Sequence, residues 1–122
     1  MITNPTQIVI TKSPDHDALS FDGVTPKVQG YKVKYFQATE DPLTATPTYI
    51  VDVGKPTPTA LGSMTITKAS VPGLFGPPLL AGVQYIPTAV AYGPGGESAV
   101  KVSTGSFVFS DTPAAPTNIT VS

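Results

Sequence analysis

His16, the only histidine of the chain, lies between Asp15 and Asp17, and this triplet comes nearest to a reactive or metal-binding set. An imidazole and two carboxylates are ligands that Zn²⁺ accepts, but adjacent residues on a strand or turn point in different directions. No second His and no Cys is present to complete a coordination sphere. We therefore predict a solvated turn at His16, with no metal and no cofactor.

Nucleophilic catalysis needs a general base and an orienting group beside the attacking Ser or Thr. His16 is the only imidazole, and no Gly-x-Ser-x-Gly elbow is present; the nearest string is Gly62-Ser63-Met64. Paired-carboxylate chemistry needs two acids that face one cleft. The eight acids lie mostly in predicted turns, with Asp52 and Glu97 isolated. We expect no enzymatic activity.

The surface is poor in charge. Charged residues form only 12% of the chain, against roughly a quarter in ordinary soluble domains. The net charge is −1 and all seven basic residues are Lys, so the forked donors of Arg are missing and we expect no nucleic-acid partner. A secreted β-domain can have this composition. So can a subunit covered by neighbours in an assembly, since interface cores are depleted in charge.

No targeting or membrane segment is predicted. Met1 leads directly into the polar residues 3–6, which do not form a signal peptide. No apolar run approaches the ~20 residues of a membrane-spanning helix, so we expect no membrane insertion. We expect either a mature fragment with an added Met or a chain made and assembled in the cytoplasm, which acts in a virion or at an extracellular or cell surface.

The elements that must position these residues are short strands. Fourteen Pro and eleven Gly interrupt the chain, and runs of β-branched and aromatic residues recur between them at spacings of about 8–12 residues, which is typical of a sandwich. Residues 28–38 alternate most cleanly, with Tyr31 and Val33 inward. The predicted strands span residues 7–12, 18–22, 28–38, 48–53, 63–68, 85–92 and 100–110, the last broken near Gly105.

Residues 79–85 have the spacing of a tyrosine corner. Leu79 precedes Tyr85 by six positions, and Gly82 precedes it by three. In such a corner the ring joins the core and the hydroxyl bonds a backbone carbonyl a few residues upstream. Gly93-Pro94-Gly95-Gly96 follows this strand, and because no helix comes after it to hold a phosphate, we predict a hairpin turn there.

Several sequence segments, in the order in which they occur along residues 5–113, resemble those of a fibronectin type III domain. In Leu19-Ser20-Phe21-Asp22, Phe21 stands where that family usually has Trp. Residues 30–35 resemble its third strand, residues 79–85 its corner, residues 91–98 its last turn and residues 111–113 its exit. The resemblance implies an all-β, seven-stranded antiparallel sandwich, mostly non-catalytic, that serves as a spacer, adhesion module or virion or surface decoration. The signature residues are Phe21, Tyr31, Val33, Leu79, Gly82 and Tyr85.

Two features depart from that family. Pro87 lies in the sixth strand, which is central, and proline has no N–H for a ladder, so we predict a bulge or break there. The link at residues 68–78 is longer than usual and apolar. If exposed, Val71, Leu74 and Phe75 would form a protein contact. The alternative, which we favour, is that this loop folds back and caps one end of the sandwich.

A second candidate patch lies near the fourth strand, which is normally at a sheet edge. Its members are Leu43, Tyr49 and Ile50. The alternative is ordinary packing of an edge strand.

The two ends of the chain repeat each other: residues 5–11 align with residues 116–122, each reading Pro, Thr and an amide before an alternating apolar pair. One interpretation is the start of a following repeat. Another is a spare strand that adds to a sheet edge of a neighbour, with Asn118, Ile119 and Val121 as contacts. A third is a disordered or self-packed tail. Asn118-Ile119-Thr120 also fits a glycosylation sequon, to which we assign no role.

Residues 1–112 are thus predicted to form a fibronectin type III-like domain, and residues 113–122 a C-terminal tail or the start of a following repeat. The leading hypothesis is a structural or interaction subunit of a larger assembly, a virion decoration or tail protein or a surface fibre. Its partners would be proteins, either copies of itself or neighbouring subunits. The alternative is a spacer or accessory repeat of a secreted bacterial multidomain protein that assists carbohydrate or cell-surface binding. A glycan-binding module ranks third, because most aromatics alternate toward the core.

Overall fold

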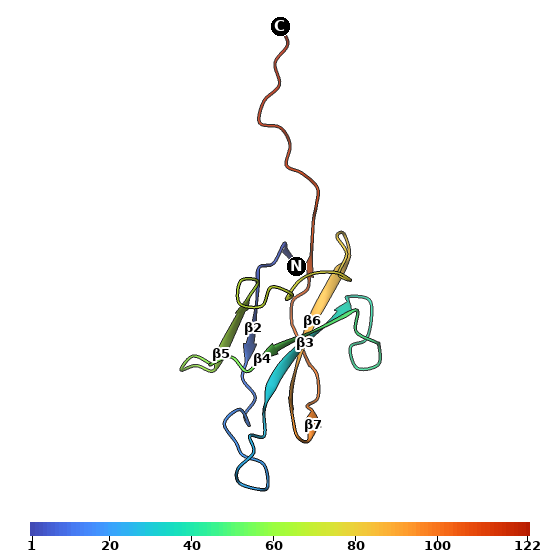
Figure 1. Ribbon diagram of the computed structural model, residues 1–122. Coiled ribbons are helices and arrows are strands. Elements are labelled where there is room, and N and C mark those ends of the chain that lie inside the picture. The colour runs from blue at the N-terminus through green and yellow to red at the C-terminus, as the bar shows by residue number, and fades with distance from the viewer.

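The computed structural model describes residues 1–122 and consists of strands, turns and loops (Figure 1). It has no helix long and apolar enough to cross a membrane. The larger, seven-stranded sheet has the order β1-β9-β6-β3-β4, with β7 and β8 also paired to β6. Its strands are β1 (Ile2–Thr3), β3 (Gly30–Gln37), β4 (Tyr49–Gly54), β6 (Gln84–Gly93), β7 (Gly96–Glu97), β8 (Lys101–Val102) and β9 (Phe107–Val108).

The second sheet contains only β2 (Gln7–Thr11) and β5 (Ser63–Thr67), which pair antiparallel. Side chains from both sheets share one core, in which the second sheet is represented by Ile10, Met64 and Ile66. The chain is therefore all-β, and its two sheets are consistent with a β-sandwich.

The central pair β3–β6 sets the direction of the side chains. Tyr31, Val33 and Tyr35 are buried, whereas Lys32 and Lys34 lie on the outer face, as the period of two in this segment predicts. The ladder between the two strands runs without a shift along all of β3. This pair is the frame on which the other strands are placed.

Tyr85 is buried at the start of β6, and its hydroxyl bonds to the backbone upstream, as in a tyrosine corner. The Leu80 N–H donates to the Tyr85 hydroxyl oxygen at 2.9 Å. The partner is thus an amide rather than the predicted carbonyl. Gly82 between them has φ of 79°, a left-handed conformation that favours glycine.

The predicted second strand at residues 18–22 does not form. Only one isolated bridge is present, between Leu19 and Pro26. Leu19 is more than half exposed and Phe21 is fully exposed. Assigning Phe21 to the structural signature was therefore wrong, because this ring does not enter the core.

A local turn competes with that strand. The Asp22 carboxylate accepts hydrogen bonds from the N–H groups of Val24 and Thr25, both at 2.9 Å, and from the Thr25 hydroxyl at 2.6 Å. Asp side chains commonly close turns in this way, and the interactions lower the pKa of Asp22, the Thr25 hydroxyl most strongly. With this segment turned outward, β5 has β2 as its only neighbour.

The prediction of a bulge or break in β6 at Pro87 was wrong, because β6 is continuous through this residue. The interruption lies in the neighbouring strand. Pro87 keeps its place opposite Tyr35 in the ladder with β3. On its other side β6 pairs with β8 at Thr88 and with β9 at Tyr85, while residues 103–106 between them form no strand. The predicted break near Gly105 is therefore confirmed, and a proline without an N–H beside it gives a physical reason.

The two ends of the folded chain meet in β1 and β9, which run parallel. The Ile2 N–H donates to the Ser106 carbonyl at 3.0 Å, and the Asn4 N–H donates to the Val108 carbonyl at 2.9 Å. The Asn4 side chain in turn accepts a hydrogen bond from the Ser110 N–H at 2.9 Å. The outer edge of β9 is covered by this contact.

Candidate interaction surfaces

His16 lies inside the molecule, so the prediction of a solvated turn at this residue was wrong. The imidazole is 4% exposed, and its Nδ1 lies 2.7 Å from the Tyr31 hydroxyl oxygen. The Ser13 N–H donates to the same oxygen at 3.0 Å. Burial raises the pKa of Tyr31. These contacts attach the segment after β2 to β3, and no group of three or more His, Asp or Glu side chains gathers at any one place.

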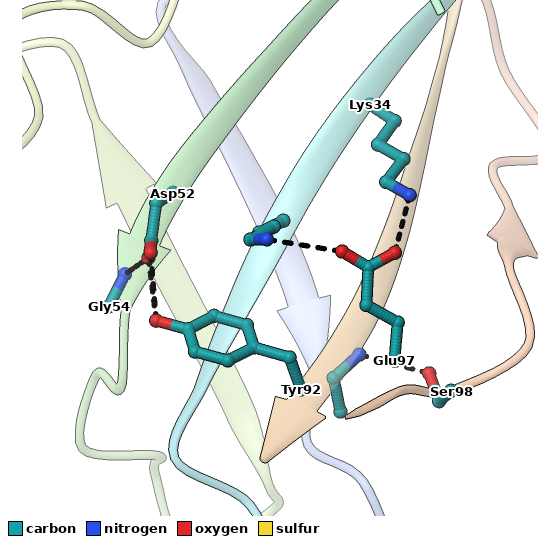
Figure 2. Close-up of polar contacts among 8 residues, drawn as sticks. Lys34, Asp52, Gly54, Tyr92, Glu97 and Ser98 are labelled. Atoms are coloured by element: carbon teal, nitrogen blue, oxygen red, sulfur yellow. Dashed lines mark hydrogen bonds and ion pairs between the residues drawn. The ribbon is translucent and has the colours of Figure 1, made fainter. Parts of the chain in front are cut away.

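The outer face of the larger sheet carries a cluster of paired charges, drawn in Figure 2. The Lys34 ammonium lies 2.6 Å from one carboxylate oxygen of Glu97, and the Lys32 ammonium lies 3.1 Å from the other. Hydrogen bonds from Lys34 and then Lys32 lower the pKa of Glu97. Glu97 thereby joins the β6–β7 hairpin to β3.

A second pair lies beside this cluster. The Tyr92 hydroxyl donates to the Asp52 carboxylate at 2.8 Å, and Asp52 also accepts the Gly54 N–H at 2.8 Å (Figure 2). The hydrogen bond to Asp52 raises the pKa of Tyr92. On this face, Glu97 is therefore paired with Lys32 and Lys34, and Asp52 is hydrogen-bonded to Tyr92.

Sequence reasoning described Asp52 and Glu97 as isolated and missed both contacts. The available signal was the outward alternation of Lys32 and Lys34, which places two ammonium groups on one face. The acid that reaches them lies more than sixty positions away, and only the folding of the hairpin brings it there. The hairpin turn itself, predicted at residues 93–96, is confirmed by the pairing of Gly93 with Gly96.

Glu97→Gln is expected to lower the free energy of unfolding at neutral pH by at most about 1 kcal/mol, because exposed ion pairs are weak. The folded-state pKa of Glu97 is depressed below 4.5, so its stabilisation is present above that pH and is lost as the pH falls through the depressed value. Urea unfolding at neutral and at acidic pH measures the difference. Asp111→Asn, in the exposed tail, is the charge-matched control, and a deficit of Glu97→Gln that does not change with pH would contradict the ionic cause.

The apolar loop at residues 68–78 lies on the core, which is the cap arrangement and not an exposed contact. Leu74 is fully buried, and its carbonyl accepts a hydrogen bond from the Tyr35 hydroxyl at 2.8 Å. Phe75 packs edge-on against Phe107, with ring centroids 5.7 Å apart. Val71 and Phe75 are partly buried against the same cluster. Leu74 is therefore not available to a partner while the loop keeps this position.

The candidate patch near β4 lies at an outer edge of the larger sheet. Leu43 is 75% exposed and Ile50 is 50% exposed, whereas Tyr49 is half-buried and donates to the Gly73 carbonyl at 2.5 Å. Two of the three side chains are thus free, and the third helps to hold the loop at residues 68–78.

A groove of about 880 Å³ lies between β2 and the last third of the chain. One wall is β2, with Ile8 and Ile10. The other wall is formed by residues 87–91 of β6 and by residues 98–107. Sequence reasoning did not predict this groove, because its two walls come from segments that lie far apart in the chain.

The C-terminal segment extends away from both sheets (Figure 1). Residues 110–122 are all exposed. No hydrogen bond within the chain involves a residue after Ser110. The predicted contact residues Asn118, Ile119 and Val121 lie in this segment and are exposed, whereas Leu74 is buried.

No protein-family model matches this chain, and a search of curated proteins finds no match either. The chain has an all-β fold consistent with a sandwich. Its unpaired surfaces include the groove beside β2, the free edges of β4 and β5, and the C-terminal tail.

Proposed function

We propose that this protein is a non-enzymatic structural or interaction subunit of a larger assembly, such as a virion decoration or tail protein or a surface fibre. The observation that carries this proposal is the groove beside β2, in which side chains of the inward face remain accessible. Accessible apolar surface of this kind marks interaction sites. The low content of charged residues supports the same function.

The arrangement of polar groups supports contact rather than chemistry. Glu97 is held by two Lys ammonium groups, and Asp52 by a Tyr hydroxyl and a backbone N–H. His16 is buried against Tyr31. Acid–base and nucleophilic catalysis need an acid, base or nucleophile that can reach a substrate. Here these side chains are bonded to other groups of the protein.

The fibronectin type III form of the sandwich is part of this proposal. It is supported by the central β3–β6 pair, by the Tyr85 hydroxyl bonded to residue 80 and by the glycine-rich turn after β6. The exposed Phe21 and the two-stranded second sheet depart from that form.

The alternative function is a spacer or accessory repeat of a secreted multidomain protein. A specific observation favours it: residues 116–122 resemble residues 5–11, which enter and form β2. A following repeat that began at Pro116 would place its own β2 there. In that case the tail is a link between domains and the groove is filled from a neighbouring repeat or remains open.

Light scattering over a concentration series separates the two functions. For an assembly subunit, the mass of the full chain is expected to rise above 12.6 kDa with concentration. A chain that stops at Asp111 loses no internal hydrogen bond and shows whether the tail is needed. Association of the full chain supports the subunit function whether or not the shortened chain associates. If both remain monomers at every concentration, the spacer function takes its place.

A further inference from the structure

We infer that the groove beside β2 binds residues 117–122 of a second copy of this chain, which add to β2 as a third strand of the smaller sheet. This inference rests on the proposed function and specifies its partner. It follows from three properties of the molecule: the free backbone edge of β2, the uncovered inward face of β6, and the composition and position of the tail.

The edge of β2 that faces the groove has unpaired backbone groups. In an antiparallel ladder, alternate residues exchange hydrogen bonds with the partner strand. The Lys12 N–H donates to the Gly62 carbonyl at 2.8 Å, which fixes the alternation, so the even-numbered residues of β2 bond to β5. The odd-numbered residues direct their N–H and C=O groups to the open side; these are Gln7, Val9 and Thr11. Such an edge is a template for another strand.

The inward face of β6 is not fully covered by the smaller sheet. Ala89 and Ala91 lie opposite Val33 and Tyr31 in the ladder, so they point toward the smaller sheet, yet both are only half-buried. Two strands are too few to span β3, β6 and β8. A third strand beside β2 would lie about 4.8 Å from it, over these small side chains, and would complete the layer.

The tail has the composition that this position requires. Ile119 and Val121 alternate with Asn118, Thr120 and Ser122, so one face of an extended strand is apolar and the other polar. Residues 112–122 carry no charged side chain, so the inserted strand would bring no side-chain charge into the groove, whose own charged lining residues are Lys12 and Lys101. The segment also repeats the pattern of β2 itself, in which Ile8 and Ile10 point inward.

The position of the tail favours a second copy over its own groove. The segment leaves β9 and runs away from the sheets (Figure 1). Pro113 and Pro116 favour extended backbone for themselves and for the residues before them. To reach its own β2, the chain would have to reverse within these residues. A second molecule meets the extended segment without any such reversal.

The repeat between the two ends gives the register. With residues 118–122 beside residues 7–11, Thr120 lies opposite Val9 at the centre of the pair in either strand direction. Ile119 and Val121 then lie beside Ile8 and Ile10 and enter the groove. Val9 is 55% exposed on the outer face, so that a side chain at this position can be changed without disturbing the core.

Single cysteines test this register, because the chain contains no Cys. We would mix ¹⁵N-labelled Val9→Cys with unlabelled Thr120→Cys, treat the mixture with a short bismaleimide and identify the products by mass spectrometry. The expected product joins one labelled and one unlabelled chain. Ile50→Cys, half-exposed at the free edge of β4, is the matched control and is expected not to react with Thr120→Cys.

A second measurement uses charge in place of a crosslink. Ile119→Asp with Val121→Asp is expected to weaken association about tenfold or more, whereas Asn118→Asp with Ser122→Asp, on the other face of the strand, is expected to leave most of it. Neither change touches the folded part of the chain, since all four side chains are exposed.

Four outcomes would overturn the inference. Crosslinking of Val9→Cys with itself would mean that two β2 edges pair directly. An intrachain product in the double variant Val9→Cys/Thr120→Cys, without a product between the single variants, would place the tail in its own groove. If no product forms while the wild-type chain still associates in light scattering, the tail is not the inserted strand and the subunit function stands. If the wild-type chain does not associate at all, the proposed function fails as well.

Discussion

Replacing Tyr35 with Ala is expected to lower the free energy of unfolding by about 3–5 kcal/mol, the range for removing a large aromatic side chain from a core. Tyr35 is fully buried. Its ring stacks on Tyr49 with centroids 5.9 Å apart and meets Phe107 edge-on at 5.6 Å. Its hydroxyl also holds the loop at residues 68–78 through the Leu74 carbonyl. One substitution therefore opens a cavity and releases the cap. Equilibrium urea unfolding gives the change.

Two conservative variants separate these contributions. Tyr35→Phe keeps the ring but leaves the Leu74 carbonyl without its donor in a buried place, and is expected to cost about 1–3 kcal/mol. Tyr49→Phe removes the equivalent bond to Gly73, which is exposed and can bind water, and is expected to cost about 1 kcal/mol or less. Burial also raises the pKa of Tyr35 far above its ordinary value, so its hydroxyl keeps its proton across the accessible pH range. Equal effects of the two variants would show that the Leu74 carbonyl is not sealed from water.

Gly93→Ala is expected to destabilise the chain by about 1–3 kcal/mol, because an overpacked site forces the backbone to move. Gly93 ends β6 where the backbone of residues 27–29 passes, and the Gln29 N–H donates to the Tyr92 carbonyl at 2.7 Å. A Cβ at this position would overlap the backbone carbonyl oxygen of Lys27. Backbone cannot rotate aside as a flexible side chain can.

Gly95→Ala, two residues along the same turn, is the matched control. A Cβ there meets no atom within 4 Å, and its φ lies outside the left-handed region. The control is expected to leave stability unchanged or to raise it by about 0.4–1 kcal/mol, because Ala restricts the unfolded chain. Thermal unfolding of both variants measures the contrast, and similar midpoints would refute close packing at Gly93.

The long strands could be predicted because their side chains repeat with a period of two. In residues 28–38 the alternation of Tyr and Val with Lys assigns each side chain to a face, and β3 follows it. Residues 18–22 have only Leu19 and Phe21 as apolar positions, and there the hydrogen bonds of Asp22 decide the structure. A pattern this short does not reveal which of two local structures has the lower free energy.

The candidate surfaces were less predictable because they depend on contacts between distant segments. The apolar sequence at residues 68–78 is equally compatible with a cap and with an exposed patch, and the Tyr35 hydroxyl decides between them. The burial of His16 requires Tyr31, fifteen positions away. The groove lies between β2 and residues 87–107, and only the folding of the chain brings these distant segments together.

The parallel pair β1–β9 has a consequence for the order in which the protein is made. Residues 2 and 3 are synthesised about a hundred positions ahead of their partners, residues 107 and 108. β1 therefore stays unpaired until residues 107 and 108 have been synthesised. Contacts between residues so far apart form late and slowly, and strands that wait unpaired are prone to aggregate. During this interval of synthesis, β1 is open to pairing with a wrong strand.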